Sequence, residues 1–129
     1  MNFYMSKTLT ASFDSSIERV TEALKAEGFG ILSDIDVRAT LKTKLNADWR
    51  SYRILGACNP PLAHQALQAE DKIGTMLPCN VIVQDIGDGS IEIATIDPAA
   101  AMAHAGGARL AELAGEVRKK LAAVLERLS

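Results

Sequence analysis

The C-terminal segment places the strongest constraint on the fold, because it carries one apolar stripe about five helical turns long. The residues of this stripe recur at helical spacing: Leu110, Leu113, Ala114, Val117, Leu121, Val124, Leu125 and Leu128. A helix with such a face must bury it, either in a coiled coil or against another part of its own chain. The stripe is shorter than the heptad runs typical of coiled coils, so we expect this helix to lie across a sheet.

The beginning of the chain predicts a strand followed by a helix. Residues 3–13 alternate between apolar and polar, with Lys7 as the one exception, which is typical of a half-buried strand. From Phe13 onward the apolar period becomes helical. Ser15 and Glu18 can form a capping box, and Gly28 stands where a C′ glycine belongs.

Four further strands are predicted, at residues 29–37, 52–58, 79–86 and 91–96. A turn of helix at 38–45, closed by Asn46, separates the first two of them. A second short helix follows the third strand, because Asn59 is an N-cap residue and Pro60 suits the first helical position. The last two strands form a hairpin through Gly87-Asp88-Gly89. The chain is therefore predicted to be a single α+β domain, residues 1–129, with one five-stranded antiparallel sheet in the order strand, helix, four strands, helix, and helices on one face.

Composition excludes several classes of protein. The chain has 14 basic and 16 acidic side chains, a formal net charge of −2, and so lacks the overall positive field of nucleic-acid-binding proteins. No apolar run approaches the roughly 20 residues of a membrane helix, and the start, MNFYMSK, lacks the apolar stretch of a secretory signal. We therefore expect a soluble, cytoplasmic protein with no nucleic-acid or membrane partner, in which both cysteines are thiols.

Three local motifs resemble a known family: RILGACNPPLA at residues 53–63, GTMLPCNV at 74–81, and Ile96-Asp97-Pro98. Together with LKAEGFGILSDIDVRATLK at 24–42, they are similar to the bacterial and archaeal domain-of-unknown-function family numbered 302, over nearly the whole chain. The resemblance implies a TATA-binding-protein-like fold and a homodimer. It implies no activity. The sequence departs from the family pattern after Pro98, where it is rich in alanine and glycine.

Cys58 and Cys79 are the most informative candidates for chemistry. Cys58 ends the third predicted strand and Cys79 begins the fourth, so the two residues lie at one edge of the sheet if these strands are antiparallel neighbours. Cys58 would also precede a helix N-terminus, which favours a thiolate. The pair could act as a redox couple or as soft metal ligands. Buried cysteines also commonly serve as small apolar packing residues.

Polar and proline residues surround the two cysteines. Asn59 and Asn80 can fix backbone turns, and Pro60 stiffens the same edge, which suggests either a ligand clamp or an architectural corner. Asp97, before Pro98, is a typical helix cap and has no visible partner for acid–base catalysis.

Other signals are weaker. His64 and His104 have no spacing that supports a zinc site with the cysteines, and no metal site is predicted. Basic residues between 38 and 53, interleaved with Trp49 and Tyr52, would suit a phosphate-bearing ligand or an acidic partner, but a solvated face is the commoner explanation. Gly106-Gly107 lies in no phosphate-binding motif, and the pair is typical of a flexible joint.

Three functions therefore remain open. The leading hypothesis is a small-ligand-binding homodimer, with the ligand between the sheet and the C-terminal helix near the CNP and LPCN motifs. Its candidate binding residues are Cys58, Asn59, Pro60, Cys79, Asn80 and Asp97, and the sequence identifies neither a catalytic residue nor a cofactor. The alternatives are a thiol-dependent redox or metal-binding protein that uses Cys58 and Cys79, and a purely structural interaction module.

Overall fold

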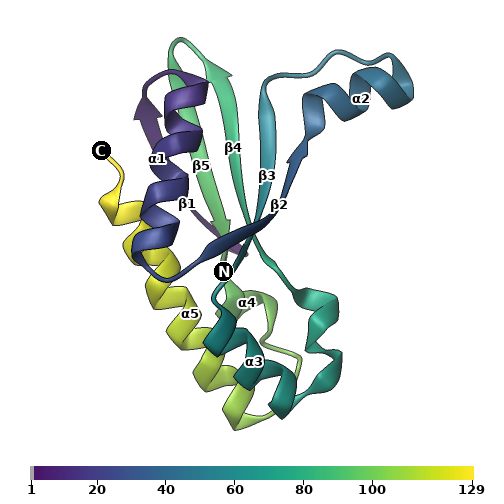
Figure 1. The fold of residues 1–129 in the computed structure, drawn as a ribbon, viewed down its shortest axis with the longest axis vertical. Coiled ribbons are helices and arrows are strands. Elements are labelled where there is room, and N and C mark those ends of the chain that lie inside the picture. Colours follow the sequence, from purple (N-terminus) through teal and green to yellow (C-terminus); the bar gives the residue numbers. More distant parts are fainter. Residues whose placement is uncertain (1) are drawn as a thin grey trace.

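The computed structural model describes residues 2–129 and contains one five-stranded sheet with helices (Figure 1). Its elements are β1 (Tyr4–Thr10), α1 (Phe13–Ala26), β2 (Gly30–Asp36), α2 (Val37–Leu45), β3 (Tyr52–Cys58), α3 (Pro60–Ala69), the 3-10 helix η1 (Asp71–Met76), β4 (Cys79–Gly87), β5 (Ser90–Ile96), α4 (Pro98–Ala101) and α5 (Ala108–Arg127). The strand order is β1-β5-β4-β3-β2, and all neighbours are antiparallel. The α+β fold predicted from the sequence is confirmed.

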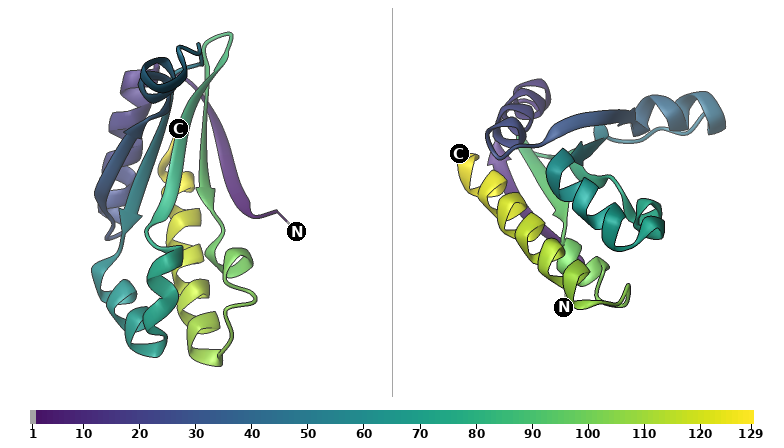
Figure 2. Two further views of the ribbon diagram at one scale, coloured as in Figure 1. Left: turned by 90° about the vertical axis from the view of Figure 1, so that its right-hand side faces the viewer. Right: turned by 60° about the horizontal axis from the view of Figure 1, so that its bottom comes forward.

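Helices α1 and α5 cover the same face of the sheet (Figure 2). Alternate residues of the central strands, including Val81 and Val83 of β4, are fully buried beneath them. Val20 and Leu24 of α1, and Leu121 and Val124 of α5, pack into this cluster. The remaining side chains of each strand point to the opposite face of the sheet, because successive residues of a strand alternate between the two faces.

The transition from β1 to α1 occurs at the residue where the apolar period changes, Phe13. The N-cap, however, is Ser12, whose side chain accepts a hydrogen bond from the backbone N–H of Ser15 at 3.2 Å. The predicted capping box of Ser15 and Glu18 is therefore wrong, because both residues already lie inside the helix. Gly28 follows the helix with a φ of 86°, as predicted for a C′ glycine.

Strand β2 contains one extra residue. Its register with β3 shifts between Ile31 and Ser33, so Leu32 has no partner and is 70% exposed. The simple alternation predicted for residues 29–37 therefore breaks at this point. Beyond the bulge, Ile35 pairs with Ile54 on the face of the sheet that α1 and α5 do not cover.

Helix α5 is divided between two apolar clusters. Its second half packs on the sheet, as predicted. Its first half, including Leu110 and Leu113, packs instead with Leu62 and Ala66 of α3 and with Ile73 of η1. The expectation that Leu113 contacts the sheet is wrong, because α5 extends beyond the end of the strands and meets α3 there (Figure 1).

Among the described residues, no helix combines the length and the apolar character needed to cross a membrane.

Candidate functional site

The candidate site lies beyond the end of the sheet, where α3 and η1 stand beside the first half of α5 (Figure 1). The chain leaves β3 at Cys58 and enters α3 immediately. Asn59 makes this possible, because its side-chain oxygen accepts a hydrogen bond from the backbone N–H of Leu62 at 3.3 Å. Pro60 occupies the first helical position, where its missing N–H has no cost. The predicted cap and proline position are confirmed.

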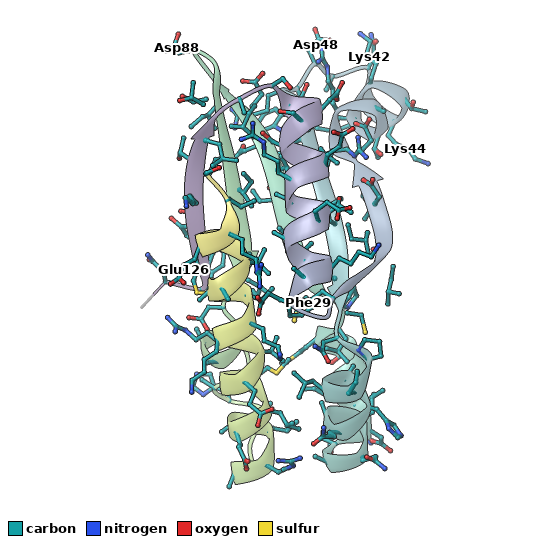
Figure 3. The ribbon with its side chains drawn as sticks, turned by 60° about the vertical axis from the view of Figure 1, so that its left-hand side comes forward. Phe29, Lys42, Lys44, Asp48, Asp88 and Glu126 are labelled. Atoms are coloured by element: carbon teal, nitrogen blue, oxygen red, sulfur yellow. The ribbon has the colours of Figure 1, made fainter. Side chains whose placement is uncertain are left out.

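Between these elements is a cavity of about 360 Å³. In the described part of the chain, no charged side chain lines this cavity, and its lining includes leucines from α3 and α5. The side chains that define its walls are those of Phe29, Leu62, Leu77, Met102, Leu110 and Leu113. Phe29 is buried where the chain passes from α1 toward β2 (Figure 3), and it lines the cavity. A space of this size and polarity suits a small, largely apolar molecule.

Both cysteines line the cavity. The register of β3 and β4 pairs Ala57 with Cys79, so Cys58 and Cys79 are diagonal neighbours at the same edge of the sheet, as expected from chain order. Both are free thiols. Cys79 is buried, and this burial, together with the nearby Cys58, raises the pKa of its thiol from 9.0 to about 11, whereas Cys58 is half-buried.

Asn59 contributes a polar residue to the cavity wall. Its oxygen caps α3, and its amide nitrogen lies against Gly28, where an added Cβ would be only 3.1 Å away. The Asn59 amide is therefore held in place by α3 on one side and by Gly28 on the other.

The other three candidate residues lie outside this cavity. Pro60 is exposed at the start of α3. Asn80 is exposed and lines a shallower hollow on the uncovered face of the sheet. Asp97 is 7% exposed and caps α4, accepting from the backbone N–H groups of Ala99 at 3.0 Å and Ala100 at 3.3 Å.

Asp97 also accepts a hydrogen bond from Arg118 Nε of α5 at 3.0 Å. Burial alone would raise the pKa of Asp97, but the hydrogen bond from Arg118 and those from the two backbone amides outweigh burial and lower the pKa below its ordinary 3.8. Asp97 thus remains a carboxylate that fixes α4 to α5, next to Pro98 in the cavity wall.

The histidines are not part of the site, since His64 and His104 are both exposed. Across residues 2–129, no group of three or more His, Cys, Asp or Glu side chains has an arrangement that could hold a metal ion.

Sequence reasoning missed most of the apolar lining. Leu62, Leu110 and Met102 are examples. Apolar side chains of this kind fill the core of any domain, so nothing in the sequence marks them as part of a binding site. The stripe in α5 gave no separate signal, because a helix of 20 residues spans about 30 Å, little more than strands of seven to nine residues.

Fold and cavity together define a class: an α+β domain with one antiparallel sheet, two helices on one face, and an apolar cavity at the end of the sheet. The sequence profile of the family described as "Domain of unknown function DUF302" matches residues 5–128, and the chain belongs to this family. It is also similar to the crystal structure of an uncharacterized conserved DUF302 protein from Bacillus stearothermophilus, with 31% sequence identity, a TM-score of 0.92 and complete coverage of both chains. No curated protein matches the sequence.

Proposed function

We propose that this protein is a binding module for a small, uncharged and largely apolar ligand, held in the cavity between α3, η1 and the first half of α5. The observation that carries the proposal is the cavity itself, about 360 Å³ in volume and lined almost entirely by apolar side chains. An ionised ligand would lose its hydration there without gaining a charged partner, so the cavity favours a neutral molecule.

The polar groups at one end of the cavity would orient the ligand by contacting its polar end. Asn59 contributes an amide, and Cys58 and Cys79 contribute thiols, whereas leucine, alanine and methionine side chains line the rest. A ligand with an apolar body and one hydrogen-bonding or sulfur-compatible end matches this distribution.

Ala63→Trp tests the proposal directly. Ala63 is half-buried in α3 and lines the cavity, so an indole at this position occupies the space that a ligand would use. Ala69→Trp, at the exposed end of the same helix, is the matched control. We expect the parent and the control to bind the neutral fluorophore N-phenyl-1-naphthylamine, and Ala63→Trp to bind it at least about tenfold more weakly.

Native mass spectrometry of the protein purified from its own host identifies the retained molecule by its mass. Equal binding of the fluorophore by Ala63→Trp and by the parent would place the probe elsewhere and contradict the proposal.

A second candidate function, thiol chemistry or soft-metal binding through Cys58 and Cys79, is favoured by one observation: both cysteines line the same cavity on neighbouring strands. Against it, the pKa of Cys79, about 11, keeps this thiol protonated near neutral pH. Mild oxidation followed by mass measurement separates the two functions, because a redox pair loses two hydrogens and a ligand-binding cavity leaves both thiols reduced.

A further inference from the structure

The candidate cavity has the form of a slot, because its lining follows two helices lengthwise. Along α3 the lining extends from Asn59 to Leu67, and along α5 it extends from Leu110 to Val117. At 1.5 Å per residue, these two stretches are about 12 Å and about 10 Å long. The helices lie side by side and in contact (Figure 1), and packed helices are only about 8–10 Å apart. The space between them is therefore longer than it is wide.

An exposed leucine lies toward each end of this slot. Leu32 lines the cavity although it is 70% exposed, and Leu67 lines it although it is 41% exposed. The register pairs Ile31 with Ala57, so Leu32 lies on the sheet side of Asn59, whereas Leu67 lies two turns of α3 beyond Asn59. The slot thus reaches the surface at both ends. A ligand that extended along it would cover apolar surface at Leu67 that is now in water.

The polar end of the slot offers a hydrogen-bond donor. Oδ1 of Asn59 accepts from the backbone N–H of Leu62, so the Nδ2 amide group is the part of Asn59 that remains to donate to a ligand. Across residues 2–129, no charged side chain lines the cavity. An uncharged oxygen, such as that of a hydroxyl or a carbonyl group, can accept from Asn59 without needing a charged partner.

The distance between Asn59 and Leu67 limits the length of the ligand. An extended chain advances about 1.2 Å per bond, because a peptide unit of three bonds spans about 3.3–3.6 Å. A slot about 12 Å long therefore holds an extended chain of about ten carbons. The volume agrees with this length, since 360 Å³ at about 30 Å³ for each water-sized group holds about twelve such groups.

We propose that the ligand of this cavity is an unbranched alkyl or acyl chain of about ten carbons with an uncharged oxygen at one end. The oxygen accepts a hydrogen bond from Asn59, the chain lies between α3 and α5, and its far end covers Leu67. This inference rests on the function proposed above, because it specifies the ligand of the same cavity. It excludes compact polycyclic molecules with the same number of carbons, which are too wide for the slot.

A series of primary alcohols tests the shape of the ligand by displacing N-phenyl-1-naphthylamine, whose flat rings suit the same slot. From 1-hexanol to 1-decanol, we expect the affinity to rise about fourfold with each methylene, because each one is buried. Longer alcohols should gain little more, since their additional carbons pass Leu67 into water. 1-Adamantanol, a compact alcohol with ten carbons, should bind at least about tenfold more weakly than 1-decanol.

Leu67→Asp tests the far end of the slot. Gln68→Asp, at the next and equally solvent-facing position of α3, is the matched control, and circular dichroism verifies that both variants fold. We expect Leu67→Asp to weaken the binding of 1-decanol at least about fivefold and to leave that of 1-hexanol unchanged, because a six-carbon chain held at Asn59 ends before Leu67. Gln68→Asp should bind both alcohols as the parent does. Leu67→Gln, which adds no charge, repeats the test if Leu67→Asp unfolds.

Three results would overturn this inference while the parent still binds the fluorophore, and so would leave the proposed binding function in place. 1-Adamantanol displaces the fluorophore as well as 1-decanol does, or Leu67→Asp binds 1-decanol as tightly as the parent, or Leu67→Asp weakens both alcohols equally. A parent that binds no fluorophore would instead contradict the proposed function, and this inference with it.

Discussion

Among the glycines of the described chain, Gly56 in β3 has the least room for a side chain. A Cβ at this position would collide with the side-chain oxygen of Ser33 and would lie 2.7 Å from Cγ of Pro78. Pro78 lines the candidate cavity and precedes β4, so its displacement would disturb the cavity wall. We predict that Gly56→Ala lowers the free energy of unfolding by about 1–3 kcal/mol, as overpacking of a rigid site does.

Gly30→Ala is the control for this prediction, since Gly30 lies on the adjacent strand β2 and an added Cβ there meets nothing within 4 Å. Urea denaturation of the three proteins measures the difference. If the two alanine variants unfolded at the same urea concentration, Ser33 and Pro78 would have to be free to move, and the contact would not constrain the fold.

The two thiols should differ in reactivity. Cys58 is half-buried, whereas Cys79 is buried and its pKa is raised to about 11 by burial and by the nearby Cys58. We predict that iodoacetamide at pH 8 alkylates Cys58 in the native protein well before Cys79, and that Cys79 reacts only on unfolding or at strongly alkaline pH. Peptide mapping by mass spectrometry gives the order, and equal rates at pH 8 would show that Cys79 is accessible.

Local sequence was sufficient to predict the capping roles of Asn59 and Asp97, because a cap depends on the residue and on the few backbone groups that follow it. It was also sufficient to place Cys58 near Cys79. Local sequence did not predict the position of Asn80. Cys79 lines the cavity, whereas Asn80, its neighbour in the same motif, lines the hollow on the opposite face of the sheet.

At the scale of elements, α5 performs two tasks. Its second half completes the core under the sheet, and its first half forms one wall of the cavity. The stripe in the sequence predicted the helix and its buried face. It could not show where the sheet ends, because that depends on which strands pair and in what register. The bulge at Leu32 in β2 was not predicted either, because a bulge also depends on the register between two strands.

Leu121 lies in the half of α5 that contacts the sheet and is fully buried. We predict that Leu121→Asp costs several kcal/mol, because it removes apolar contacts and places a carboxylate in the core without a partner. Ala111→Asp, at an exposed position of the same helix, should change stability little. Thermal unfolding compares them, and a Leu121→Asp protein that melts with the parent would mean that α5 does not pack on the sheet in solution.

At the scale of the molecule, the cavity exists because α3 and η1 are inserted between β3 and β4 and stand beyond the strand ends. This insertion needs its own apolar cluster, which the first half of α5 supplies. Two side-chain hydrogen bonds add to this packing. Arg109 donates a hydrogen bond to Gln65 of α3, and Arg118 donates to Asp97 at the end of β5.

The Asp97–Arg118 contact makes the stability of the whole molecule sensitive to acid. The pKa of Asp97 in the folded state lies below its ordinary value of 3.8, because hydrogen bonds from Arg118 and from the backbone of α4 outweigh the opposing effect of burial. A carboxyl group whose pKa is lowered by folding stabilises the folded state above its unfolded pKa, and this contribution is lost as the pH falls through the folded pKa. Asp34, whose pKa is lowered by the hydrogen bond from Arg53, acts in the same direction.

We therefore predict that the free energy of unfolding decreases as the pH falls below about 4, and that Asp97→Asn makes this decrease shallower. Asparagine retains the oxygen that caps α4 but carries no charge for Arg118, so the variant should already be less stable at pH 7. Asp88→Asn, at the exposed tip of the β4–β5 hairpin (Figure 3), is the charge-matched control and should retain the slope of the parent. Urea titrations at closely spaced pH values between 2 and 7 measure all three slopes. An Asp97→Asn slope as steep as that of the parent would assign the acid sensitivity to other carboxylates and would show that the contact between β5 and α5 does not depend on this charge.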